Sequence, residues 1–190
     1  MRIRQIVLRT LAVAAGLGAW FFTQGLIASR PFPDKGIGDG LFDLTSPIHA
    51  HLLSNPSQAN FLLIASSFVI DLLGIFLLLS AIFGPSIRPF LGLLLVFALR
   101  QMCQGLCALP EPEGMIWRYP GFPSLLVTYG TASDLFFSGH TSIAVFGSTE
   151  LARRGGFFWK SLGLLIACFE ASTVIVLRAH YTMDVFTGVI

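Results

Sequence analysis

Apolar residues in this chain gather into long blocks, which alternate with long and short polar segments. A helix needs about 20 apolar residues to cross a hydrocarbon core of about 30 Å. Five blocks meet or approach this length, at residues 6–28, 61–83, 89–109, 135–152 and 157–177. A sixth begins near His180 and stops at Ile190, which covers only about 16 Å of helix. The pattern predicts an all-α polytopic transmembrane bundle with five full spans and a truncated sixth.

The composition agrees with a membrane location. The chain is 54% hydrophobic and 12% charged, whereas soluble domains carry about 25% charged residues. The predicted spans occupy the whole length, so residues 1–190 should form a single membrane-embedded domain whose C-terminal span is incomplete. The net charge of +2, without a basic run, argues against nucleic acid as a partner. The first apolar block exceeds the 7–15 residues of a signal-peptide core, so it should be a retained span.

The polar segments predict a topology. The long segments at residues 29–60 and 110–134 fall on one side of the membrane, and the tight turns at 84–88 and 153–156 fall on the other, with the N-terminus. The side with the tight turns holds more Lys and Arg than the side with the long segments, seven against four. Because positive residues favour the cytoplasmic side, we expect a cytoplasmic N-terminus. Both histidine motifs described next should then face the periplasm or a lumen.

Two short motifs near the C-terminal end carry the chemistry. They are Phe-Ser-Gly-His-Thr at residues 137–141 and His-Tyr-Thr-Met-Asp at residues 180–184. If one helix holds both His180 and Asp184, the two side chains share a face, and the carboxylate can bond one imidazole nitrogen. The other nitrogen would then be free to attack or to accept a proton. Both motifs should start helices on the same side, where free N–H groups suit a phosphate, and Ser138 and Gly139 permit close approach of an anion to the backbone.

A phosphoryl group also needs a cation, and Arg100 and Arg178 are the candidates. Arg100 should lie about 13 Å deep in its span, where an arginine is costly unless it is paired or faces a polar cavity. The alternative for Arg100 is a structural ion pair with Asp71. Glu170 should pair with another span. His49 and His51 are two potential metal ligands, but loop histidines without a metal are the better interpretation.

The two motifs resemble those of the sphingomyelin synthase-like branch of the type 2 phosphatidic acid phosphatase superfamily. That branch has the pattern C-G-D-x-x-x-S-G-H-T followed by H-Y-T-x-D-V. This chain reads A-S-D-L-F-F-S-G-H-T from residue 132 and H-Y-T-M-D-V from residue 180, so only the C-G is absent. The L-P-E-P-E-G run at residues 109–114 and the F-F-S-G-H core look closest to phosphatidylcholine:diacylglycerol cholinephosphotransferases of the plant type.

The resemblance implies a role for each matching residue. His180 would be the nucleophile that takes the phosphoryl head group as a phosphohistidine, and Asp184 would orient it. His140 would protonate the departing alkoxide and then deprotonate the incoming alcohol. The residues expected to bind substrate are Arg100, Asp134, Ser138, Gly139, Thr141, Arg178 and Tyr181. The scheme needs no metal and no cofactor.

The resemblance also implies the partners, a phospholipid donor with a phosphocholine-like head group and diacylglycerol or another lipid alcohol as acceptor. A lipid phosphate phosphatase, which uses water as the acceptor, is the alternative that the same residues would serve. The broader superfamily's Lys-x6-Arg-Pro motif is absent, because Arg88-Pro89 lacks the lysine, and this favours transfer. An alternative of another class is a catalytically silent lipid-binding or scaffold protein.

Overall fold

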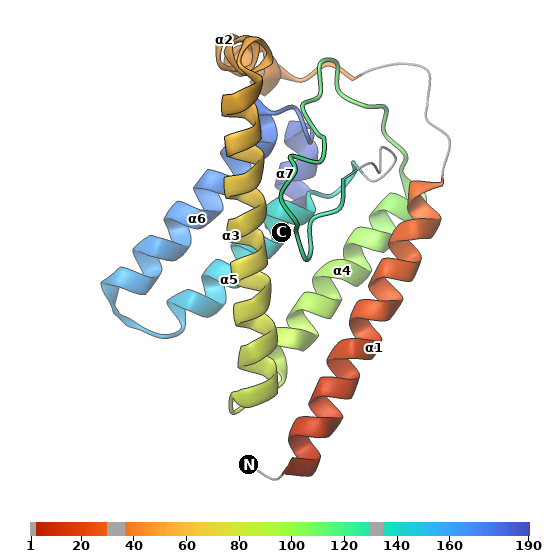
Figure 1. The fold of residues 1–190 in the computed structure, drawn as a ribbon, viewed down its shortest axis with the longest axis vertical. Coiled ribbons are helices and arrows are strands. Elements are labelled where there is room, and N and C mark those ends of the chain that lie inside the picture. Colours follow the sequence, from red (N-terminus) through yellow and green to blue (C-terminus); the bar gives the residue numbers. More distant parts are fainter. Residues whose placement is uncertain (1–2, 30–36, 130–134) are drawn as a thin grey trace.

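The computed structural model describes residues 3–29, 37–129 and 135–190, where every regular element is a helix (Figure 1). This confirms the predicted all-α class for the described ranges. The helices are α1 (Ile3–Ala28), α2 (Gly40–Ser54), α3 (Pro56–Phe83), α4 (Arg88–Leu106), α5 (Gly139–Ala152), α6 (Gly156–Val176) and α7 (Thr182–Val189).

Four of these helices, α1, α3, α4 and α6, are long and apolar enough to cross a membrane, and they correspond to four of the five predicted spans. They confirm an integral membrane protein. The block at residues 135–152 behaves differently, because its helix begins only at Gly139. At 14 residues α5 is about 21 Å long, less than the hydrocarbon thickness. Five full spans and a truncated sixth therefore stay a prediction.

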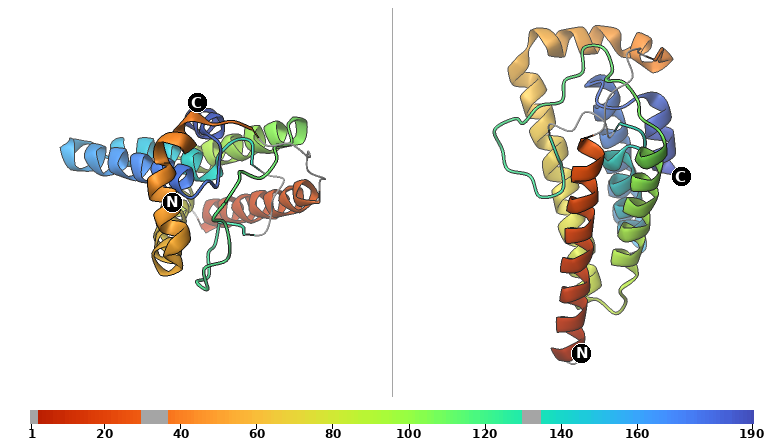
Figure 2. Two further views of the ribbon diagram at one scale, coloured as in Figure 1. Left: turned by 90° about the horizontal axis from the view of Figure 1, so that it is seen from above. Right: turned by 90° about the vertical axis from the view of Figure 1, so that its right-hand side faces the viewer.

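Helix α2 is an element that the sequence reading missed, since residues 29–60 were expected to form a polar connection. It lies across the end of α3 at a steep angle (Figure 2). Phe42, His49 and Leu52 are buried against the bundle, while Leu44 and Ile48 are exposed. This is the amphipathic pattern of a surface helix, which the run of polar and proline residues around it obscured.

The short turns and the N-terminal end of α1 lie at one end of the bundle, and α2 and the long segment after α4 lie at the other (Figure 1). This grouping agrees with the predicted topology, whereas the side that faces the cytoplasm stays a prediction. Two contacts fix the end with the short turns. Arg9 donates to the carbonyl of Gly84 at 2.9 Å, and Arg88 pairs with Glu150 at 2.7 Å.

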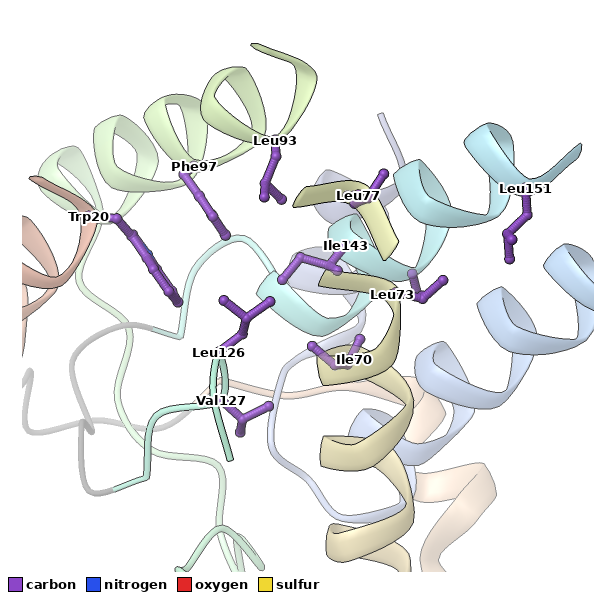
Figure 3. Packing of buried hydrophobic residues seen from close by; sticks show 11 residues of the cluster. Trp20, Ile70, Leu73, Leu77, Leu93, Phe97, Leu126, Val127, Ile143 and Leu151 are labelled. Atoms are coloured by element: carbon purple, nitrogen blue, oxygen red, sulfur yellow. The ribbon is translucent and has the colours of Figure 1, made fainter. Parts of the chain in front are cut away.

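The long segment after α4 turns back into the bundle, where Leu126 and Val127 pack among α3, α4 and α5 (Figure 3). Non-helical backbone at membrane depth needs protein partners for its N–H groups. Asp71 on α3 is the partner here, because its carboxylate accepts hydrogen bonds from the Leu125 and Leu126 amides at 2.8 and 2.9 Å. Asp71 thus anchors the returning segment, and the ion pair with Arg100 considered above was wrong.

Helices α5 and α6 form a closely packed antiparallel pair. A side chain at Gly163 would lie 2.9 Å from the carbonyl oxygen of Ser148, so only glycine allows this approach. The Ser148 hydroxyl donates to the Gly163 carbonyl at 2.7 Å across the same contact. Glu170 is fully buried and accepts a hydrogen bond from Ser66 of α3 at 2.6 Å, which confirms that it pairs with another helix. These contacts hold α5 against α6 and α6 against α3.

Candidate active site

The first histidine motif forms the N-terminal turn of α5, as predicted. Ser138 is the N-cap, and its hydroxyl accepts hydrogen bonds from the amide and hydroxyl of Thr141 at 3.3 and 3.0 Å. His140 is the second residue of the helix and is 7% exposed. Its ring stands edge-on to Trp117, with the centroids 5.1 Å apart, and its Nε2 has no hydrogen-bond partner among the described residues. This nitrogen is therefore available to a substrate.

The second motif differs from the expectation that His180 begins a helix. Helix α7 starts at Thr182, with Tyr181 as its N-cap, so His180 lies just outside it. The connection from α6 turns at Arg178, whose φ of 52° is left-handed, and the amide of Ala179 donates back to the Val174 carbonyl at 2.9 Å. This tight turn sets the position of His180 at the end of α6.

The hydrogen-bond partner of His180 also differs from the expectation. Its Nδ1 lies 2.7 Å from the carbonyl oxygen of Leu135 and 3.9 Å from the Asp184 carboxylate. A carbonyl oxygen only accepts hydrogen bonds, so Nδ1 carries the hydrogen in this contact and the lone pair of neutral His180 is on Nε2. The predicted pairing of His180 with Asp184 is thus present at ion-pair distance, while the hydrogen bond at Nδ1 goes to the Leu135 carbonyl. The Nε2 of His180 is nevertheless free, as predicted, because the Leu135 carbonyl occupies Nδ1.

Asp184 instead organises the turn around His180. Its Oδ2 accepts a hydrogen bond from the Tyr181 amide at 2.8 Å, and its backbone carbonyl accepts one from the Ser138 amide at 2.9 Å. Its other carboxylate oxygen, Oδ1, is buried without a hydrogen-bond partner in the described part of the chain. The carboxylate therefore fixes the start of α7 and lies close enough to stabilise a positive charge on His180.

Arg100 completes the group from α4. It is 7% exposed, and its Nη1 donates to the side chain of Gln24 on α1 at 2.6 Å. A Cβ atom placed on Gly139 would lie 3.1 Å from the Arg100 Nε, so the guanidinium runs directly over the start of α5. The structure thus brings Arg100 to the N-terminal end of the helix that carries His140, where the expected phosphate would also meet free backbone N–H groups.

Arg100, Gly139, His140 and His180 line one small cavity of about 40 Å³. Since a water molecule needs about 10–15 Å³ on the same measure, the cavity has room for roughly three water-sized groups. Its walls come from α1, α3, α4, α5, the returning segment and the turn before α7. They are formed by Trp20, Ile70, Phe97, Arg100, Trp117, Leu126, Val127, Thr128, Leu135, Gly139, His140, Ile143, Ala179 and His180.

The six other predicted site residues are not in the cavity lining or lie outside the described ranges. Ser138, Thr141 and Asp184 hold the neighbouring turns, as described above. Arg178 donates to the Glu113 carbonyl at 2.8 Å and covers the ring of Phe42, so it does not line the cavity. Tyr181 is buried and stacks on the same Phe42 ring at 5.5 Å. Asp134 lies outside the described residues.

The sequence reading missed Asp39. Its carboxylate accepts hydrogen bonds from both the amide and the hydroxyl of Thr182, the first residue of α7, and from the Leu41 amide of α2. Partial burial acts to raise the pKa of the Asp39 carboxyl, but these hydrogen bonds outweigh it and lower the pKa below its ordinary value of 3.8. An aspartate just ahead of an amphipathic run is an N-cap signal, and this signal could have located α2 but not the contact with α7.

His49 and His51 lie on α2, which corrects their interpretation as loop residues. The Nδ1 of His49 is 2.9 Å from the Val176 carbonyl oxygen, and His51 hydrogen-bonds to Gln58, so they face different neighbours. Within the described ranges, no group of three His, Cys, Asp or Glu residues could hold a metal ion.

Comparison with known proteins places the histidine motifs in a family. A family model described as AtPDCT1/2, for phosphatidylcholine:diacylglycerol cholinephosphotransferases, matches residues 38–190. The matched range begins just before α2 and includes His140, His180 and Arg100. No curated protein matches the chain, and no solved structure does.

Proposed function

The chain belongs to the phosphatidylcholine:diacylglycerol cholinephosphotransferase family, and from this premise we propose that it transfers a phosphocholine-like head group from a phospholipid to a lipid alcohol. The acceptor is diacylglycerol or a similar lipid. The proposal includes a covalent phosphohistidine and assigns the reaction to the cavity between α4, α5 and the turn before α7. The transfer belongs to the sphingomyelin synthase-like type, in which no metal or cofactor takes part.

The observation that supports this proposal most directly is the shared cavity of the two histidines and Arg100. A nucleophile, a group that exchanges a proton and a cation are the three components that phosphoryl transfer through a covalent intermediate requires. The Nδ1 of His180 is occupied by the Leu135 carbonyl, so its Nε2 lone pair is available for attack. No other group of this kind is found in the described part of the chain.

In the first step, the Nε2 lone pair of His180 attacks the phosphorus of the donor. The bond between phosphorus and the glycerol oxygen breaks, and His140 gives a proton to the departing oxygen, which releases diacylglycerol. In the second step, the acceptor hydroxyl loses its proton to His140 and attacks the phosphorus, and the bond to His180 breaks. The product is a phospholipid with the same head group, and both histidines return to their starting state.

Arg100 and the N-terminal end of α5 would stabilise the phosphoryl oxygens, since both supply N–H donors to the same wall of the cavity. Asp184 lies 3.9 Å from the His180 ring and would favour the positive charge that develops there. Ser138 and Thr141 hold the first turn of α5 in place through their mutual hydrogen bonds. Arg178, Tyr181 and Asp134 are retained as proposed substrate-binding residues, although Arg178 and Tyr181 pack on Phe42 apart from the cavity.

The test is a transfer assay with purified protein, short-chain phosphatidylcholine and fluorescent diacylglycerol. Transfer predicts fluorescent phosphatidylcholine, formed only when both lipids are present. His140→Gln should lower the rate by about 10²–10⁴-fold, the usual contribution of acid–base catalysis. Release of phosphocholine without any diacylglycerol would instead support the phosphatase. Absence of any turnover by folded protein would support the silent lipid-binding or scaffold protein.

A further inference from the structure

Helix α1 lies outside the range that matches the family, yet it forms part of the cavity wall. Most of α1 is exposed on the surface of the bundle, but Val13, Trp20 and Gln24 are buried and share one face of the helix. Trp20 lines the cavity and stacks flat on Phe97 of α4, with the ring centroids 4.4 Å apart. This contact sets the position of α1 one turn before Gln24.

Gln24 is 3% exposed and contacts the arginine of the site. Its Oε1 accepts a hydrogen bond from Arg100 Nη1 at 2.6 Å and a weaker one from the Gln101 side chain at 3.3 Å. Burying a polar side chain such as that of Gln24 costs free energy unless the side chain forms hydrogen bonds. Its burial against α4 therefore requires a specific partner, and the short contact with Arg100 supplies one.

We propose that Gln24 is a positioning residue that directs the Arg100 guanidinium into the cavity, so that α1 completes the site for the phosphodiester of the donor lipid. The inference rests on the proposed function. An amide is suited to this role because it accepts a hydrogen bond from arginine without a negative charge of its own. A glutamate in its place would hold the guanidinium equally well but would add a charge that repels an anionic phosphodiester.

The critical variant is Gln24→Glu, with Gln24→Leu as its partner. Gln24→Glu keeps an acceptor for Arg100, so its melting temperature should stay near that of the unsubstituted protein. Its KM for short-chain phosphatidylcholine should nevertheless rise about tenfold or more, because an added charge weakens anion binding. Gln24→Leu loses the acceptor, so its kcat should fall about 10–100-fold as Arg100 loses its position.

Thr23→Val is the matched control on the same helix. Among the described residues, the Thr23 hydroxyl bonds only to carbonyls of its own helix, at Ala19 and Trp20, so KM and kcat should not change. If Gln24 is only a packing contact, Gln24→Glu should have the KM and kcat of the unsubstituted protein, and that result would overturn the inference. Equal changes in Thr23→Val would overturn it as well.

A binding measurement separates this inference from the proposed function. Short-chain phosphatidylcholine should raise the melting temperature of the unsubstituted protein and of Thr23→Val, and should raise that of Gln24→Glu much less. This pattern supports the role of Gln24 even if no transfer is detected, in which case the proposed function fails alone. If the unsubstituted protein transfers the head group and the lipid raises the melting temperature of Gln24→Glu by the same amount, the proposed function stands and the inference about Gln24 is refuted.

Discussion

Asp39 connects α2 to the first residue of α7, and its removal should loosen the turn that carries His180. The Asp39→Ala variant loses the acceptor of the Thr182 amide and hydroxyl and the N-cap of α2. A hydrogen bond to a charged group contributes about 1.5–3 kcal/mol. Because Asp39 is partly exposed, solvent screening reduces this, and we expect a loss of about 1–2 kcal/mol for the docking of α7.

A loss of this size corresponds to an increase of about 5–30-fold in the population of undocked α7. Hydrogen exchange measured on the peptide that covers α7 should accelerate by the same factor, and the transfer rate should fall. Asp39→Asn keeps one acceptor oxygen, so its exchange rate in α7 should lie between the rates of Asp39→Ala and the unsubstituted protein. Thr182→Val removes only the hydroxyl donor, so it should accelerate exchange less than Asp39→Ala does. The double variant Asp39→Ala/Thr182→Val should lose less docking free energy than the sum of the two single losses, because the two residues share one contact.

The pH dependence of this contact follows from its carboxyl group. The pKa of Asp39 lies below 3.8 because of its hydrogen bonds, so the contact is fully present above that pH and is lost as the pH falls through the lowered pKa. Between pH 5 and 8, the factor by which Asp39→Ala accelerates exchange in α7 should therefore not change with pH. If Asp39→Ala leaves both exchange and transfer unchanged at pH 7, the positioning role of Asp39 is refuted.

Three further predictions test other contacts. Gly188→Ala should lower transfer, because its Cβ would lie 2.7 Å from the Ser138 carbonyl oxygen and push α7 from α5. Gly25→Ala is the control and should not lower transfer, because its Cβ would meet no atom of the described residues within 4 Å. Asp71→Asn should reduce unfolding stability by about 1–3 kcal/mol in a denaturant titration, because an amide cannot accept both loop N–H groups; unchanged stability would contradict its anchoring role. Leu77→Ala should cost about 2–5 kcal/mol in the same titration, because the side chain is fully buried, and a loss below 1 kcal/mol would contradict the packing described.

The sequence predicted the long helices well, because each consists of an apolar run that spacing alone can detect. Residues 135–138 misled the prediction of α5. They are mostly apolar, yet they form the turn that supplies the Leu135 carbonyl to His180, and Phe137 has a left-handed φ of 73°. Their hydrophobicity reflects burial inside the bundle, which a count of apolar residues cannot distinguish from a membrane span.

The two histidines were predictable from their motifs, but their partners were not. Spacing suggested that Asp184 bonds His180, whereas the structure gives the hydrogen bond at Nδ1 to a backbone carbonyl, which has no signal in the sequence. Likewise, Asp71 was a reasonable partner for Arg100, because both residues were expected near the middle of the membrane. Its carboxylate instead accepts hydrogen bonds from two amides of the returning segment. Gln24 and Asp39 join the site through contacts that depend on how distant segments pack.

The phosphohistidine proposed on His180 can be tested directly by trapping the intermediate. The protein is incubated with phosphatidylcholine that carries a labelled phosphocholine group, without acceptor, and is then denatured and digested for mass spectrometry. A covalent mechanism through His180 predicts an acid-labile phosphocholine group on His180 that diacylglycerol removes and that His180→Ala never acquires. Normal transfer by His180→Ala, or a label on any other residue, would contradict it.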